Sequence, residues 1–120
     1  MIELDRIHKV DALEGLRQLE ANSVSLVLTD PPYNVASASR QTIRHGKVMS
    51  TMKAWGQWDS YDPYDYNLWI CQVISQCFRV LKPGGSLYMF TARDDNGFFL
   101  RRAVERGFSY RNQLVIVKKN

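Results

Sequence analysis

The feature that most constrains the fold of this chain is the tetrapeptide Asp-Pro-Pro-Tyr at residues 30–33, directly after the apolar run Val24–Thr29. The run is almost entirely apolar or β-branched and lacks strict alternation, which is typical of a parallel strand buried on both faces. Open α/β sheets place their functional groups beyond the carboxyl ends of such strands. The sequence therefore predicts a parallel α/β sheet with a candidate site at residues 30–33.

The four residues of this motif can together hold an amino group and a flat ring. The ionised carboxylate of Asp30 only accepts hydrogen bonds. Pro31 has no N–H group, and its carbonyl is a natural second acceptor. The rings of Pro31 and Pro32 fix two φ angles and restrict the residue before each ring, which makes this edge rigid. Tyr33 offers a face on which an extruded base stacks, so we expect the site to bind the exocyclic amine of a nucleobase.

The motif resembles the signature of the DNA amino-methyltransferases that modify adenine N6 or cytosine N4, and Asn34 matches a common extension of that signature. Residues 7–16 are similar to the strand, acidic residue and helix start that precede it, with Val10 where Gly is usual. Residues 78–90, which include Leu-Lys-Pro-Gly-Gly, are similar to a helix-turn-strand unit of S-adenosylmethionine-dependent methyltransferases in general. The resemblance implies methyl transfer from S-adenosyl-L-methionine to double-stranded DNA, as in restriction-modification systems.

The resemblance also implies roles for individual residues. Asp30, Pro31, Pro32 and Tyr33 would form the catalytic motif, and Asp30 would also contact the cofactor. Asp11 would reach the adenine of S-adenosylmethionine, and its position equally suits a helix N-cap; the two roles are compatible. An Asp at the first motif position favours adenine N6 over cytosine N4, where Ser is frequent.

A polar stretch without clear periodicity follows the motif at residues 35–62, and unstructured connections of that length are usually functional or mobile. It contains four basic residues and no acidic residue between Val35 and Gln57: Arg40, Arg44, Lys47 and Lys53. We expect this loop to contact DNA phosphates near the flipped base, with Tyr33 and Asn34 at the base itself. A solvated surface loop is the alternative. The net charge of +4 fits a nucleic-acid partner, although many unrelated proteins are as basic.

Apolar periodicity predicts alternating strands and helices in one small domain. Strands are expected at residues 6–10, Val24–Thr29, 86–91 and 110–117, and helices at residues 12–20, 64–81 and 94–106, the second helix being stopped by the Pro-Gly-Gly turn at residues 83–85. With the resemblance, this pattern predicts a partial Rossmann-like methyltransferase fold whose parallel sheet is incomplete.

The missing parts follow from the strand order of the methyltransferase fold, 3-2-1-4-5-7-6. The four expected strands correspond to strands three, four, five and six, and the other three have no counterpart. The Gly-rich cofactor loop after strand one is also absent, because none of the seven glycines lies in a Phe-x-Gly-x-Gly pattern. Circularly permuted members, the beta class, place that loop after the target-recognition region. We interpret the chain as the catalytic part of a split or truncated enzyme, completed by a second chain or a C-terminal half.

Two other function classes stay open. One is a catalytically inactive remnant that binds DNA or a partner. The other is a methyltransferase acting on amines of protein or RNA, but such enzymes usually carry Asn where this chain has Asp30. The sequence has no run of about 18 apolar residues and starts with acidic residues, so we expect a cytoplasmic protein of a bacterium or phage. Cys71 and Cys77, without a neighbouring His or Cys cluster, predict neither a disulfide nor a zinc site.

Overall fold

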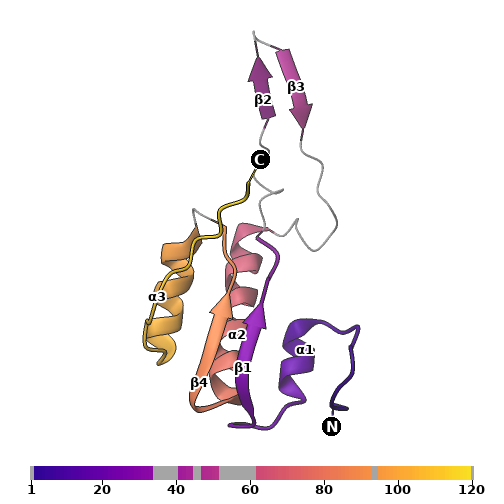
Figure 1. The fold of residues 1–120 in the computed structure, drawn as a ribbon. Helices are drawn as coiled ribbons and strands as arrows, with labels where there is room; N and C mark the ends of the chain where they lie inside the picture. The colour runs from indigo at the N-terminus through magenta and orange to yellow at the C-terminus, as the bar shows by residue number, and fades with distance from the viewer. Residues whose placement is uncertain (1, 34–40, 45–46, 52–61, 93–94, 120) are drawn as a thin grey trace.

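The structure, a computed structural model, describes residues 2–33, 41–44, 47–51, 62–92 and 95–119. Three helices and four strands follow one another as α1 (Ala12–Arg17), β1 (Val24–Thr29), β2 (Gln41–Arg44), β3 (Lys47–Thr51), α2 (Pro63–Val80), β4 (Leu81–Met89) and α3 (Asn96–Arg106) (Figure 1). Strands β1 and β4 form a parallel pair, and β2 and β3 form an antiparallel hairpin. The predicted α/β class with an incomplete parallel sheet is confirmed.

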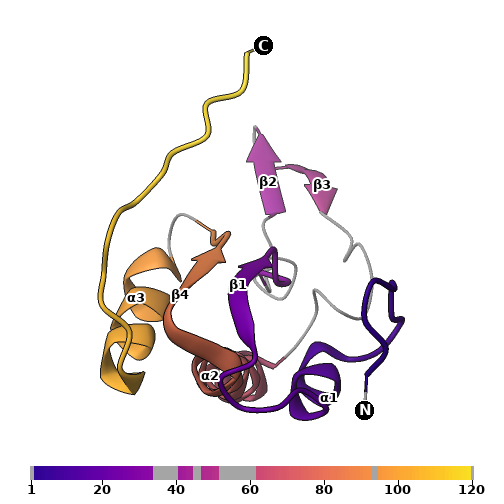
Figure 2. The ribbon, with the colours of Figure 1, turned by 60° about the horizontal axis from the view of Figure 1, so that its bottom comes forward.

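The core lies between α2 and the inner face of the parallel strands. Asp62 caps α2, because its carboxylate accepts hydrogen bonds from the backbone N–H groups of Tyr64 and Asp65. Buried side chains recur along the helix at helical spacing and meet one residue each of α1 and α3; the cluster consists of Leu13, Tyr66, Ile70, Val73, Ile74, Cys77 and Phe99. Val27, Leu87 and Met89 pack against it from the strands. Figure 2 shows α2 beneath β1 and β4, with α1 and α3 on either side of it.

The Pro-Gly-Gly segment does not form the turn that we predicted after α2. The helix ends at Val80, and its C-cap Leu81 is already extended with ψ 134°; the next residue, Lys82, precedes Pro83 and is disfavoured in helical conformation. Residues 82–85 instead form a bulge inside β4: Val24 pairs with Leu81, whereas Leu26 pairs with Ser86. Gly84 has φ +82°, a left-handed value that glycine adopts without strain. The strand therefore starts earlier than the predicted residue 86.

Two of the predicted strands, at residues 6–10 and 110–117, are absent. In the first segment, two side chains contact Glu3 instead of lying along a strand. The guanidinium of Arg6 pairs with the carboxylate of Glu3 at 3.1 Å, and the ring of His8 hydrogen-bonds the Glu3 carbonyl at 2.7 Å. The second leaves α3 as an extended thread whose apolar side chains are exposed (Figure 2). A strand needs a neighbour for its backbone N–H and C=O groups. In the family order these segments would pair with strands two and seven, for which the sequence has no counterpart.

The two remaining helices are close to prediction. Helix α1 is shorter than the predicted 12–20 and ends at Arg17. The guanidinium of Arg79 in α2 donates to the carbonyl of Leu16 at 2.8 Å, and the same carbonyl accepts the backbone N–H of Leu19 at 3.1 Å, so the end of α1 is tied to α2. Helix α3 begins at Asn96, two residues later than predicted, and ends at Arg106 as predicted, with Gly107 as its C-cap.

The outer face of the parallel pair is apolar and exposed. It carries Leu26, Leu28, Tyr88 and Phe90. No helix or strand within the described ranges covers this face, so β1 and β4 pack on one side only, and the predicted burial of Val24–Thr29 on both faces is wrong. The helices that the structure describes include none long and apolar enough to cross a membrane.

The stretch at residues 35–62, which we predicted to lack regular structure, contains the hairpin of β2 and β3. Its register pairs Gln41 with Thr51 and Arg44 with Lys47. Both views show the hairpin beyond the carboxyl ends of β1 and β4 (Figures 1 and 2). The rest of the stretch, at residues 35–40, 45–46 and 52–61, lies outside the described residues.

Candidate active site

The motif at residues 30–33 lies at the carboxyl end of β1, as the sequence predicts. The last hydrogen bond of the parallel pair runs from the N–H of Phe90 to the carbonyl of Thr29 at 2.9 Å. The chain then leaves the sheet, because two consecutive prolines have no N–H group to continue the ladder. Pro31 is buried and Asp30 is exposed. The carboxylate therefore stands on a rigid edge that solvent can reach.

Asp30 and Tyr33 interact directly. The Tyr33 hydroxyl donates a hydrogen bond to Oδ1 of Asp30. The pKa of Tyr33 is raised to about 12, first by burial and then by the hydrogen bond to Asp30 and its negative charge. The phenol thus stays protonated at neutral pH and remains a donor. The carboxylate that an incoming amine would need already holds one hydroxyl donor.

A residue that our sequence analysis missed also contacts the motif. The hydroxyl of Tyr66, on the first turns of α2, donates to the carbonyl of Pro32 at 2.6 Å across 34 residues of sequence. Its ring is buried in the core. A signal was available: Tyr66 precedes Ile70 and Val73 at helical spacing, and a tyrosine on a buried face needs a partner for its hydroxyl. The identity of that partner could not be read from the sequence.

Asp11 is the N-cap of α1, as predicted. Its Oδ1 accepts hydrogen bonds from the backbone N–H groups of Leu13 at 2.9 Å and Glu14 at 3.3 Å. The residue is exposed, and both capping bonds end on the same oxygen. The contact between Asp11 and a cofactor stays a prediction.

The predicted DNA-contacting residues are only partly described. Arg44 is the last residue of β2 and Lys47 the first of β3, and the two occupy one register pair. Two basic residues therefore lie opposite each other at the hairpin tip, beyond the end of β1 that carries the motif (Figure 1). Asn34, Arg40 and Lys53 lie outside the described residues.

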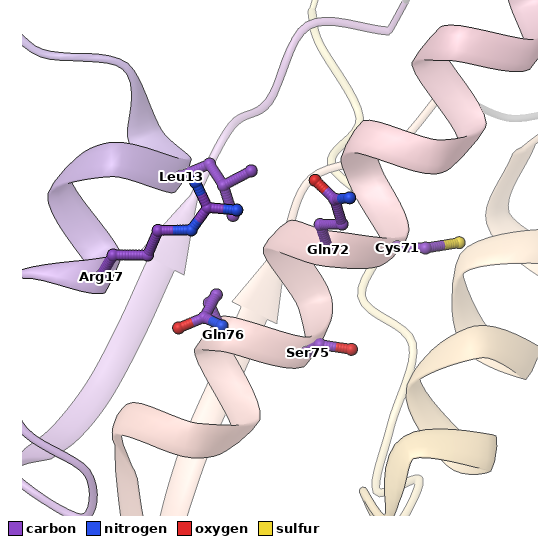
Figure 3. Close-up of a pocket in the computed structure, with 6 residues that line it drawn as sticks. All are labelled: Leu13, Arg17, Cys71, Gln72, Ser75 and Gln76. Atoms are coloured by element: carbon purple, nitrogen blue, oxygen red, sulfur yellow. The ribbon is translucent and has the colours of Figure 1, made fainter.

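An open hollow of about 260 Å³ lies between α1 and α2, away from the motif. It is lined by Leu13, Arg17, Cys71, Gln72, Ser75 and Gln76. Figure 3 shows Leu13 and Arg17 on one side and the two glutamines on the other. None of the predicted site residues lines it. Its lining offers one charged group, on an exposed side chain, and we assign it no function.

The two cysteines are free thiols in α2. Burial raises the pKa of Cys77 to about 11 and also raises that of Cys71, which is less buried. Both are therefore mainly protonated at neutral pH, which suits packing rather than nucleophilic chemistry. Among the described residues there is no group of three or more His, Cys, Asp or Glu side chains that could hold a metal ion.

Comparison with known proteins places this geometry in a family. Residues 24–120 match the family model described as DNA methylase. The chain is 29% identical over 126 residues to the type II methyltransferase M1.MboII of Moraxella bovis, an alignment covering 100% of this chain and 40% of that protein. It is 32% identical over 88 residues to the DNA adenine methyltransferase YhdJ of Escherichia coli, covering 73% of the chain and 25% of the relative.

A third relative gives the same picture. The chain is 24% identical over 134 residues to the type II methyltransferase M.HindIII of Haemophilus influenzae, covering 92% of the chain and 42% of that protein. The chain thus spans less than half the length of each of these three relatives. Because the family model covers most of its residues, the chain belongs to the DNA methylase family, the S-adenosylmethionine-dependent DNA amino-methyltransferases whose signature it carries at residues 30–33.

Proposed function

We propose that this chain carries the catalytic part of a site-specific DNA methyltransferase, which methylates the exocyclic amine of a base flipped out of the duplex. The observation that carries the proposal is the Asp30–Tyr33 pair on a solvent-exposed edge at the carboxyl end of β1. Membership of the DNA methylase family supports it.

The motif meets the needs of amino methylation. The lone pair of an exocyclic amine is delocalised into the ring, so the nitrogen must be drawn towards tetrahedral geometry before it attacks. Asp30 accepts one N–H of the amine, and the carbonyl of Pro31 accepts the other. These fixed acceptors also favour the positive charge that develops on the nitrogen. Tyr33 provides the face on which the flipped base stacks.

The bond between Tyr33 and Asp30 adds a step to this scheme. The phenol, which its raised pKa of about 12 keeps neutral at pH 7, holds Oδ1 of Asp30 before a base arrives. The incoming amine then either takes the second carboxylate oxygen or displaces the hydroxyl. In both cases the ring of Tyr33 starts beside the carboxylate, within reach of the base that the carboxylate binds.

Adenine N6 is the favoured target. The motif begins with Asp, whereas Ser is frequent at this position in the cytosine-N4 enzymes that the motif resembles. A relative 32% identical over 88 residues is named a DNA adenine methyltransferase. Cytosine N4 remains the second candidate within the same chemistry.

S-adenosylmethionine supplies the electrophilic methyl group when bound. Among the described residues, Asp11 and Asp30 suit contact with it. Asp11 fits because both capping bonds end on Oδ1 and the residue is exposed, which leaves its other oxygen for polar groups of the cofactor. The Gly-rich loop would come from a second chain or a C-terminal half. The exposed apolar face of β1 and β4, with Leu26 and Tyr88, supports a further layer on this sheet.

DNA would lie along the hairpin of β2 and β3. Arg44 and Lys47 share one register pair, so two of the four basic residues of this segment come from adjacent strands. A segment with four basic and no acidic residues between Val35 and Gln57 suits a polyanionic partner. An inactive remnant that binds DNA through this hairpin is the alternative function.

Replacement of Asp30 by alanine tests the proposal. In single-turnover methylation of a duplex, with the chain complemented by the part that supplies the Gly-rich loop, Asp30→Ala should lower the rate by about 10²–10³-fold or more. Duplex binding should change little, since the carboxylate acts mainly in the transition state. Asp95→Ala, at the N-cap of α3, is the matched control. Transfer by Asp30→Ala at near wild-type rate would contradict the proposed mechanism, and a wild-type complex that binds DNA but transfers no methyl group would favour the alternative.

A further inference from the structure

We propose that Tyr66 is a positioning residue of the candidate active site. Its hydroxyl, on α2, holds the carbonyl of Pro32 by a hydrogen bond and thereby orients Asp30 and the Pro31 carbonyl. This inference rests on the proposed function. It assigns a role to a residue that lies outside the motif and 34 positions from Pro32 in sequence.

The position of the Tyr66 hydroxyl is determined by the core. The side chain is only 3% exposed. Its ring lies 6.4 Å from that of Trp69 and 6.4 Å from that of Phe99, measured between ring centroids. Its backbone N–H bonds the carbonyl of Asp62, the residue that caps α2. The capped helix start and the packed ring together place the hydroxyl before any substrate binds.

The topology explains why this helix turn reaches the motif. Helix α2 connects the parallel strands β1 and β4, so it runs antiparallel to both and its first turn lies at their carboxyl ends (Figure 1). Tyr66 stands on that turn, and Pro32 follows the end of β1. The hydrogen bond of 2.6 Å therefore joins the two elements at the edge of the sheet where the candidate site lies.

Anchoring one carbonyl constrains its neighbours because the motif has few free rotations. The rings of Pro31 and Pro32 fix both φ angles, and Pro31 is buried. Once the Pro32 carbonyl points at Tyr66, the peptide planes on either side of Pro32 have little room to turn. On the far side of the prolines, Tyr33 holds Asp30. The two tyrosine hydroxyls thus hold the motif at two points, one at the carboxylate and one at the backbone.

Tyr66→Phe separates positioning from packing, because it keeps the buried ring and removes only the hydroxyl. Tyr64→Phe is the matched control, on the same helix turn but exposed. The first measurement needs no enzymatic activity. NMR of the chain alone at pH 10 measures the fraction of Tyr33 that is present as phenolate. Wild type and Tyr64→Phe should keep the phenol almost fully protonated. Tyr66→Phe should raise the phenolate fraction measurably, because a looser motif would expose the Tyr33 phenol to water and weaken its hydrogen bond to Asp30, and these are the causes that raise its pKa.

The second measurement is methyl transfer by the complemented chain. Tyr66→Phe should lower kcat by about 10-fold to 100-fold, as misplacement of reacting groups does, with KM for the duplex within about twofold of wild type. Tyr64→Phe should change neither. An unchanged phenol titration together with unchanged kcat would overturn the positioning role and leave the proposed function standing. A wild-type complex without activity would remove the proposed function, and the phenol titration would still decide whether Tyr66 holds the motif.

If Tyr66→Phe does not fold, the wild-type chain decides the question. A hydroxyl proton held in a buried hydrogen bond exchanges slowly with water, so that of Tyr66 should be visible by NMR while that of Tyr64 is not. Exchange of the Tyr66 proton as fast as that of Tyr64 would overturn the proposal.

Discussion

Two segments with similar composition have different fates in this molecule. Val24–Thr29 and residues 110–117 are both rich in apolar and β-branched residues, and both are expected to be strands. The first pairs with β4 and places Val27 against the core. The second passes α3 as an unpaired thread with Val115 and Ile116 exposed (Figure 2). An apolar, β-branched sequence pattern therefore predicts which segments can form a strand. Whether such a segment does form a strand depends on a neighbouring strand to which its backbone can hydrogen-bond.

Helices do not depend on a neighbour in this way. Their backbone hydrogen bonds are internal, so α1, α2 and α3 form close to their predicted positions although part of the sheet is missing. The strand order of the family predicts which two of the four expected strands can pair with each other. Strands four and five are adjacent in it, and their counterparts here, β1 and β4, are the pair that forms.

The largest expected change in stability comes from replacing an isoleucine in the core and comparing it with an isoleucine in the unpaired segment at residues 110–117. Ile70→Ala removes a fully buried side chain and should lower the free energy of unfolding by about 2–5 kcal/mol. Ile116→Ala removes a side chain that is 68% exposed and should change it by less than about 0.5 kcal/mol. Urea unfolding followed by circular dichroism measures both. Equal losses would mean that residues 110–117 pack in solution, and the contrast between the segments would fail.

The parts of the site that depend on residues close in sequence could be predicted, and those that depend on residues distant in sequence could not. The place of Asp30 was predictable, because a buried strand pattern and two prolines are contiguous in sequence. The capping role of Asp11 was predictable for the same reason. The contact between Tyr66 and Pro32 spans 34 residues, and only the packing of α2 against β1 creates it. The end of α2 before the Pro-Gly-Gly segment was predictable from contiguous residues, whereas the bulge of that segment inside β4 was not, because its partner strand lies about sixty residues upstream.

A smaller effect is expected from the two glycines at the ends of α3. Gly107 has φ +127°, and a Cβ there would lie 2.8 Å from the ring of Phe78, so Gly107→Ala should cost about 1–3 kcal/mol. Gly97 lies inside the helix with open space around it, and Gly97→Ala should stabilise the protein by about 0.5–1 kcal/mol. Thermal unfolding of both variants should therefore shift in opposite directions. A stabilising shift for Gly107→Ala would contradict the close approach of Gly107 to the ring of Phe78.

The smallest expected change in stability comes from comparing two aspartates at helix N-caps, one that makes capping hydrogen bonds and one that does not. Asp11 accepts hydrogen bonds from two backbone N–H groups at the start of α1, and Asp11→Ala should cost about 1 kcal/mol. Asp95 occupies the same position before α3 but makes no capping hydrogen bond through its side chain. Asp95→Ala should therefore change the free energy of unfolding by less than about 0.5 kcal/mol. Chemical denaturation in parallel resolves such a difference, provided that the slope with denaturant is unchanged.

Asp11→Asn sharpens this last comparison, because asparagine caps helices about as well as aspartate but carries no charge. It should keep most of the stability that Asp11→Ala loses. If it does, its effect on cofactor binding by the complemented chain isolates the second role proposed for Asp11, free of any change in α1. Equal stability of Asp11→Ala and wild type would contradict the cap, and would mean that α1 is held by Leu13 in the core and by the bond from Arg79 to Leu16 instead.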